Sequence, residues 1–139
     1  MTVENIEFII ERTILKIGNE LNNIRISDLK QYDMTTGQSE TMLFFEAAEG
    51  ARALDLKKHL SITHQAARNY VERLKAKGLL YTEVSGTDAR GKSVMLTEEG
   101  RDVCRKLRQK GCDTGKDILS DLSGEEKEEL LRLLRRIRT

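Results

Sequence analysis

The chain has 139 residues, of which 38% are hydrophobic, 34% charged and 4% aromatic, and its net charge is +1. This length predicts a single domain over residues 1–139 and leaves little room for a separate catalytic domain. The sequence holds no proline, which favours long helices, and no apolar run of about eighteen residues, so we predict no membrane-spanning helix. The N-terminus lacks the basic and apolar regions of a secretory signal, so we expect a cytoplasmic protein.

The first two predicted helices differ in what they cover. Residues 3–30 predict a long helix, because isoleucine and leucine recur every three or four positions along it. Such a stripe either docks on another chain or covers the core of its own domain. A second helix is predicted at 37–49, with Thr36 as its N-cap. It carries two of the three phenylalanines and therefore belongs at the centre of the core.

The middle of the chain predicts two short helices and a hairpin. The helices lie at 53–60 and at 64–77, the latter capped by Thr63. The apolar period then changes from 3.6 to 2 in residues 80–84 and 92–96, which predicts a β-hairpin. Two short helices joined by a tight turn and followed by a hairpin form a winged helix-turn-helix. The predicted fold class is therefore mainly α, with a β-hairpin wing.

The last part of the chain predicts two more helices. Thr97 is placed to cap a long helix at 98–120. Ser123-Gly-Glu-Glu126 has the spacing of a capping box, which predicts a final helix at 124–138. The N- and C-terminal helices both carry apolar stripes, and a lobe of about sixty residues has too small a core to cover both.

The charges are unevenly spread along the chain. Residues 51–110 hold 14 Lys and Arg against 7 Asp and Glu, whereas residues 1–50 hold 4 against 9 and residues 111–139 hold 6 against 7. A basic centre between acidic ends favours a polyanion partner, although a chance cluster of solvated side chains gives the same pattern.

The outward face of the second short helix predicts contact with DNA. His64, Gln65, Arg68 and Asn69 share one face of this helix, and no acid follows them before Glu72. Glutamine and asparagine can pair with adenine and arginine with guanine in the major groove. The alternative is an ordinary solvated face, but such faces use glutamate and lysine freely. The residue types therefore favour a base-reading helix.

At this point the sequence resembles the MarR family of bacterial and archaeal transcription regulators. The family's wing signature is matched by Asp88-Ala-Arg90, five further residues and Leu96-Thr97. The resemblance continues in residues 71–80, at the end of the recognition helix, and in residues 122–126, at the start of the last helix. One departure is Ala51-Arg52-Ala53, which stands where the family usually has a Ser or Thr cap.

The resemblance implies roles for the matched residues. Arg90 at the wing tip would enter the minor groove, and Asp88 would orient the wing by charge pairing. Residues 63–69, starting at Thr63, would read the major groove. Lys75 and Lys92 would neutralise phosphates. The resemblance also implies that segments 1–34 and 112–139 form a two-fold dimer around a DNA-binding lobe at 36–110.

These observations predict a homodimeric, sequence-specific DNA-binding regulator, which we expect to be a repressor acting on a palindromic operator. A small-molecule effector, if one exists, would bind between the dimerisation helices and the DNA-binding lobe. The alternative is a winged-helix protein-interaction module that does not bind DNA. No catalytic constellation is visible, and two histidines with two distant cysteines, Cys104 and Cys112, predict neither a metal site nor a cofactor.

Overall fold

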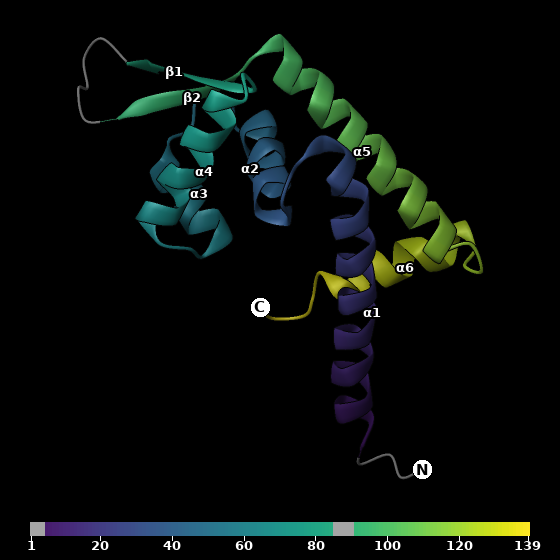
Figure 1. Ribbon diagram of the computed structural model, residues 1–139. Coiled ribbons are helices and arrows are strands. Elements are labelled where there is room, and N and C mark those ends of the chain that lie inside the picture. The colour runs from purple at the N-terminus through teal and green to yellow at the C-terminus, as the bar shows by residue number, and fades with distance from the viewer. Residues whose placement is uncertain (1–4, 85–90) are drawn as a thin grey trace. The chain divides into compact units, whose positions relative to one another are not determined.

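A computed structural model describes residues 5–84 and 91–139 of the chain (Figure 1). The described residues form six α-helices, one 3-10 helix and one antiparallel pair of strands, which confirms the predicted mainly helical winged fold. In chain order the elements are α1 (Ile6–Leu29), η2 (Lys30–Tyr32), α2 (Thr36–Ala47), α3 (Ala53–Leu60), α4 (His64–Ala76), β1 (Leu80–Val84), β2 (Lys92–Leu96), α5 (Glu98–Ile118) and α6 (Gly124–Leu134). The chain divides into two compact units, Met1–Cys104 and Arg105–Thr139, and the boundary falls within α5.

The N-cap of α2 differs from the prediction. Thr35 caps this helix, and the prediction of Thr36 was wrong, because Thr36 is already helical. The Thr35 hydroxyl accepts a hydrogen bond from the Gln38 backbone N–H at 3.1 Å. The Gln38 side-chain oxygen in turn accepts one from the Thr35 N–H at 3.2 Å. This reciprocal pair is a capping box, which a glutamine three residues after a threonine makes possible.

The N-termini of the other helices agree with the sequence patterns more closely than the C-termini do. The hydroxyl of each remaining predicted cap accepts a backbone N–H three residues on, as seen in Thr63 with Ala66, Thr97 with Gly100 and Ser123 with Glu126. Five of the six helices end earlier than predicted, and the largest difference is in α6, which ends at Leu134. Beyond α6 the chain tightens into turns, and Arg136 N–H bonds to the Leu133 carbonyl at 3.0 Å. Such tightening is common at helix ends.

The core of the first unit is built around α2, as its phenylalanines predicted. Met42 and Phe45 of this helix are completely buried. They share the core with residues that are also fully or almost fully buried: Leu56 of α3, Leu74 of α4, Leu80 of β1, Val94 and Leu96 of β2, and Cys104 of α5. Close approach of α2 and α4 depends on Gly37, because a Cβ there would overlap the ring of Tyr70.

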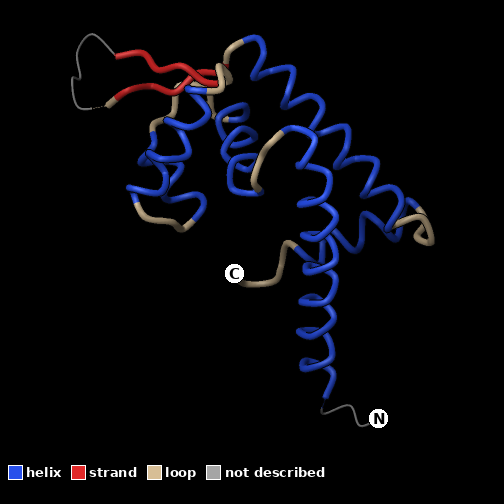
Figure 2. The backbone as a smooth tube through the Cα atoms, viewed as in Figure 1, coloured by secondary structure: helices blue, strands red, loops and turns tan. Residues whose placement is uncertain are grey.

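The hairpin packs one face on this core and leaves the other open. Leu80 pairs with Leu96, and Val84 pairs with Lys92 at the opposite end of the ladder (Figure 2). The connection between α2 and α3 also bonds to β2. The Gly50 N–H donates to the Val94 carbonyl at 3.0 Å, and the Val94 N–H donates to the Ala51 carbonyl at 2.8 Å. These bonds hold the start of α3 beside the base of the hairpin.

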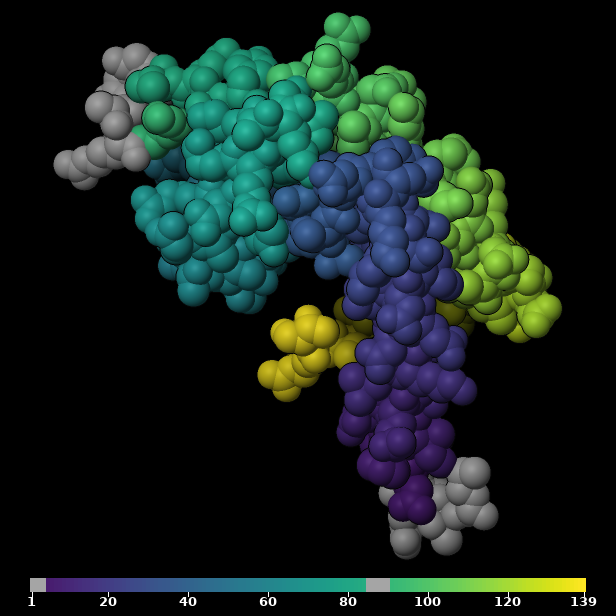
Figure 3. Space-filling model, in the orientation of Figure 1, coloured from purple at the N-terminus to yellow at the C-terminus, as the bar shows by residue number. Residues whose placement is uncertain are grey.

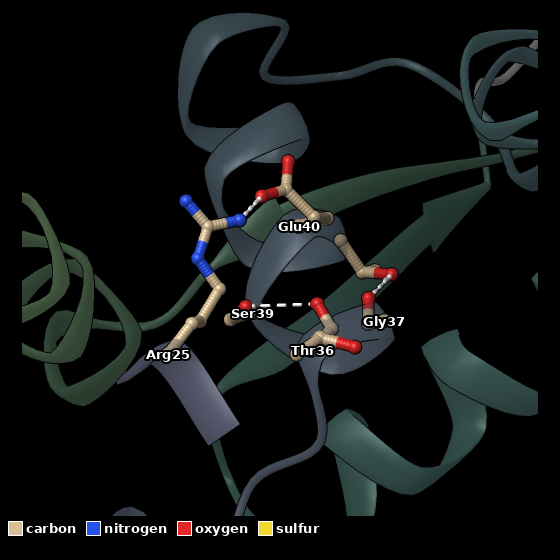
Figure 4. Close-up of polar contacts among 6 residues, drawn as sticks. Arg25, Thr36, Gly37, Ser39 and Glu40 are labelled. Carbon is tan, nitrogen blue, oxygen red and sulfur yellow. Dashed lines mark hydrogen bonds and ion pairs between the residues drawn. The ribbon is translucent and has the colours of Figure 1, made fainter. Parts of the chain in front are cut away.

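Helix α1 leaves most of its apolar stripe exposed. Only Leu29 at its end is buried, whereas Phe8 is 58% exposed and Ile10 is 48% exposed. Figure 3 shows the N-terminal part of α1, in purple, extending beyond the winged lobe. Near its other end α1 is tied to α2 by an ion pair between Arg25 and Glu40 at 2.5 Å (Figure 4).

The second unit also exposes apolar side chains. Leu131, Leu133 and Leu134 of α6 are each exposed by nearly half. Beside them, hydrogen bonds from the Arg132 guanidinium hold the pKa of the Glu129 carboxyl below its usual value. Each unit by itself therefore leaves the apolar stripe of its terminal helix exposed.

Two further observations concern membrane and metal sites. Within residues 5–84 and 91–139, no helix is long and apolar enough to span a bilayer. The same residues contain no group of three His, Cys, Asp or Glu side chains that could hold a metal ion. Neither cysteine forms a disulfide. Cys104 is buried, with its sulfur 3.5 Å from the Met42 carbonyl, and Cys112 is exposed.

Two glycines of α5 should respond oppositely to alanine. A Cβ at Gly100 would overlap the Leu79 carbonyl oxygen, so Gly100→Ala should destabilise the fold by about 1–3 kcal/mol. A Cβ at Gly111 meets nothing within 4 Å, so Gly111→Ala should stabilise the helix by about 0.5–1 kcal/mol. Urea unfolding at one fixed protein concentration measures both, and equal effects would contradict the close approach at Gly100.

Candidate nucleic-acid interface

Helix α4 is positioned by its cap and by its buried face. The turn from α3 passes through Ser61, whose φ of 55° lies in the left-handed region, and Thr63 then caps the helix. The inner face is buried at Ala67, Val71 and Leu74. This packing fixes the rotation of α4 about its own axis. The predicted face, which comprises His64, Gln65, Arg68 and Asn69, is therefore exposed.

Three of these side chains form a hydrogen-bonded row. The Gln65 amide oxygen accepts from Nη2 of Arg68 at 3.0 Å, and the Gln65 amide nitrogen donates to the Asn69 side-chain oxygen at 3.2 Å. Gln65 therefore orients both neighbours, one through each end of its amide. The row still presents free donors of Arg68 and Asn69 to solvent, and these are the groups that pair with base edges in the major groove.

A groove runs between this helix and the hairpin. Its volume is about 390 Å³, and its apolar lining includes Leu54, Val71 and Val94. Its charged lining comprises Arg52, Arg68, Glu72 and Lys92, and His64 lines it as well. The structure thus brings together three of the predicted residues, His64 and Arg68 from α4 and Lys92 from the start of β2.

Lys75 is placed differently from the other predicted cations. It does not line the groove, and its ammonium group lies 3.5 Å from the Glu72 carboxylate. This pair is solvent-accessible and therefore weak, so it leaves the lysine available to a phosphate without directing it toward one. Asp88 and Arg90 lie outside the described residues, and their wing-tip roles stay predictions.

The sequence analysis did not select Arg52 as a site residue. Arg52 is the N-cap position of α3, and its side chain lines the groove. Its backbone N–H donates to the Asp55 carboxylate at 2.8 Å, which is the half of a capping box that the third helical residue supplies. The Asp55 N–H, which a Ser or Thr hydroxyl would accept, donates instead to the Arg52 carbonyl at 2.9 Å. The missing Ser or Thr cap was the one sequence signal at this position. It did not indicate where the Arg52 side chain would lie.

The chain was compared with known proteins. Residues 32–91 match the model of the MarR family. The multiple antibiotic resistance protein MarR of Salmonella typhimurium is 27% identical over 127 residues, which cover 91% of this chain and 88% of that protein. An uncharacterized HTH-type transcriptional regulator of Bacillus subtilis, YybA, is 26% identical over 91% of this chain and 85% of its own.

Solved structures show the same fold in related proteins. The S. aureus MepR–DNA complex matches with a TM-score of 0.77 and 26% identity, covering 91% of this chain and 93% of that chain. Wild-type MarR from E. coli in its apo form matches with a TM-score of 0.77 and 25% identity, covering 93% and 96%. The matches extend over nearly the whole chain, well beyond the segment of the family model.

A base-reading role for α4 predicts that two kinds of variant behave differently. Gln65→Ala and Arg68→Ala should relax preference at particular base pairs, because each bidentate pairing with a base contributes about 1–3 kcal/mol of discrimination. Lys92→Ala should weaken binding to all sequences about equally, since phosphates are the same everywhere. Binding to a selected site and to scrambled DNA, measured by fluorescence anisotropy, separates the two patterns. Indistinguishable variants would contradict the assignment of the recognition face.

Proposed function

We propose that the chain is a MarR-family, DNA-binding transcription regulator that acts as a homodimeric repressor of a palindromic operator. The observation that carries the proposal is the exposed row of Gln65, Arg68 and Asn69 beside a basic groove. Amide and guanidinium donors on a helix that an apolar inner face holds in place are suited to reading bases. The family consists of regulators rather than enzymes.

Dimerisation through the terminal helices is supported by exposed apolar surface. Helix α1 exposes large hydrophobic side chains along most of its length, as does α6 at its end. Contiguous apolar surface of this kind is typical of an interface. A two-fold contact between identical helices would cover it, and would also place two copies of α4 about one DNA turn apart on a palindrome.

A ligand response is supported by a second hollow at the junction of η2, α2 and α4. Its volume is about 580 Å³, and its lining includes three cations, Lys30, Arg73 and Lys77, and one acid, Asp33. Lys77 donates to the Asp33 backbone carbonyl, which holds this lysine against the turn before α2. We place the effector site here, because an anionic molecule bound to these cations would press on the end of the recognition helix. Repression would then end through a change in the spacing of two α4 helices.

The proposal predicts a steep salt dependence of DNA binding. A dimer that neutralises about six to ten phosphates should lose roughly three to five decades of affinity between 50 and 200 mM salt. Anisotropy titrations with an operator selected from a random pool measure this slope and return the half-site spacing. A flat response would favour the alternative, a winged-helix module that binds protein instead of DNA.

Dimerisation through α1 is tested by replacing two isoleucines of its exposed apolar stripe with aspartate. Ile10 and Ile14 are 48% and 42% exposed and lie one turn apart. Ile10→Asp with Ile14→Asp should give a monomer at micromolar concentration that retains helical structure, because it removes apolar side chains from the interface alone. Lys16→Asp on the same helix is the control and should remain dimeric. Sedimentation velocity distinguishes the species, and a dimeric double variant would rule out this interface.

A further inference from the structure

The guanidinium of Arg52 has no charged partner among the residues that the structure describes. Its backbone N–H caps α3 through Asp55, but its guanidinium forms no ion pair among the residues that the structure describes. The residue is exposed and stands at the edge of the groove between α4 and the hairpin. The guanidinium therefore contributes its full charge to this groove, and it does not neutralise an acid within residues 5–84 and 91–139.

The position of the Arg52 side chain depends on Gly91. A Cβ at Gly91 would overlap Cδ of Arg52 and would lie 2.9 Å from Nη1. The backbone of Gly91 is not in the left-handed region, so its conformation alone does not require glycine. Glycine is required at this position because the aliphatic part of the Arg52 side chain lies directly against the backbone at the start of β2. The hydrogen bonds between Val94 and the segment 50–51 keep these two backbones together.

The electrostatics of the groove favour an anion. Arg52, Arg68 and Lys92 give it three permanent positive charges from three different elements. Glu72 is the one acid among the lining residues, and it already contacts the Lys75 ammonium. A guanidinium binds phosphate through two parallel hydrogen bonds, which an ammonium cannot do. The Arg68 guanidinium already donates to Gln65 at 3.0 Å, so Arg52 is the groove cation best suited to fix a phosphate in one orientation.

We propose that Arg52 binds a backbone phosphate of DNA in the groove between α4 and the hairpin. We also propose that Gly91, which has no side chain, leaves the space that the Arg52 side chain occupies there. The inference rests on the DNA binding proposed above and adds to it a contact that fixes the register of the recognition helix. The ligand is the phosphate backbone of double-stranded DNA, so the contact carries no base preference of its own.

Three variants of the whole protein test the contact. Arg52→Ala should weaken binding to selected and scrambled DNA alike, by about ten- to hundredfold, since it removes a charge-assisted hydrogen bond from each half-site. It should also lower the salt slope by about 0.9 per half-site. Arg52→Lys should keep the slope but recover only part of the affinity. Lys58→Ala removes a charge from the far end of the same helix and is the control, with a smaller effect on both quantities.

A structural role for Arg52 predicts a different result. If the side chain only braced the hairpin, Arg52→Ala would lower the melting temperature and leave the salt slope unchanged. On our proposal the melting temperature stays within about 2 °C of the parent, as is usual for an exposed side chain. A parent protein that binds DNA with a steep slope, together with an unchanged Arg52→Ala variant, overturns this inference but leaves the proposed function standing. A parent with no salt-dependent binding overturns both.

The contact between Gly91 and the Arg52 side chain is tested by a double-mutant cycle. Gly91→Ala should displace the arginine and weaken DNA binding nearly as much as Arg52→Ala does. In the Arg52→Ala background the same change should have almost no further effect, because the displaced side chain is already gone. Additive effects would show that the extra methyl distorts the hairpin itself, and the role assigned to Gly91 would be wrong.

Discussion

The candidate interface depends on the packing of α4 against α2. Ala67, Val71 and Leu74 occupy one side of α4 and are buried on the core around Met42 and Phe45. A helix held by three buried positions cannot rotate about its axis without exposing them, at about 25 cal/mol for each Å² of apolar surface returned to water. The opposite face is consequently fixed in solvent. The small residue Gly37 lets Tyr70 close the same contact on its edge.

The hairpin takes part in the interface because it is bonded to the turn before α3. The hydrogen bonds of Val94 with Gly50 and Ala51 make that turn an extension of the sheet. Arg52 follows directly and is thereby brought beside Lys92, forty residues away in the sequence. The basic groove is thus a consequence of backbone pairing, and its cations come from α4, from the hairpin and from the cap of α3.

The lobe around α2 is well packed, whereas the N-terminal helix α1 is poorly covered. Around α2 the side chains fill the interior, and two glycines are required by close approach. Along α1 the isoleucines stay exposed although their spacing is that of a packing face. Such a difference within one chain is what an obligate partner would produce, since the stripe is then buried only in the assembly.

The order and type of the elements could be predicted from local signals in the amino-acid sequence. The apolar period, the caps at Thr63, Thr97 and Ser123, and the change to period 2 are local, because each acts within a few residues of the backbone that it shapes. The exposure of the predicted face of α4 also followed from the pattern of one helix. The N-cap at Thr35 was missed by one position, since two adjacent threonines offer the same hydroxyl and only the glutamine after them distinguishes the two.

How distant residues combine depended on the folded chain. The fold placed Arg52 against Gly91 and in the groove with Lys92, joined Gln65 to both of its neighbours, and left Lys75 beside Glu72 outside the groove. The placement of Arg52 does not follow from spacing, because side-chain direction at a helix cap depends on what the rest of the fold leaves open. The contacts of Gln65 and of Lys75 lie within α4 at spacings of three and four, which the helix itself allows, but which of them forms depended on the folded chain. Whether the α1 stripe would cover its own core was equally undetermined by its period. The size of the core decided it, because α2 and its neighbours fill the interior with only the end of α1, at Leu29.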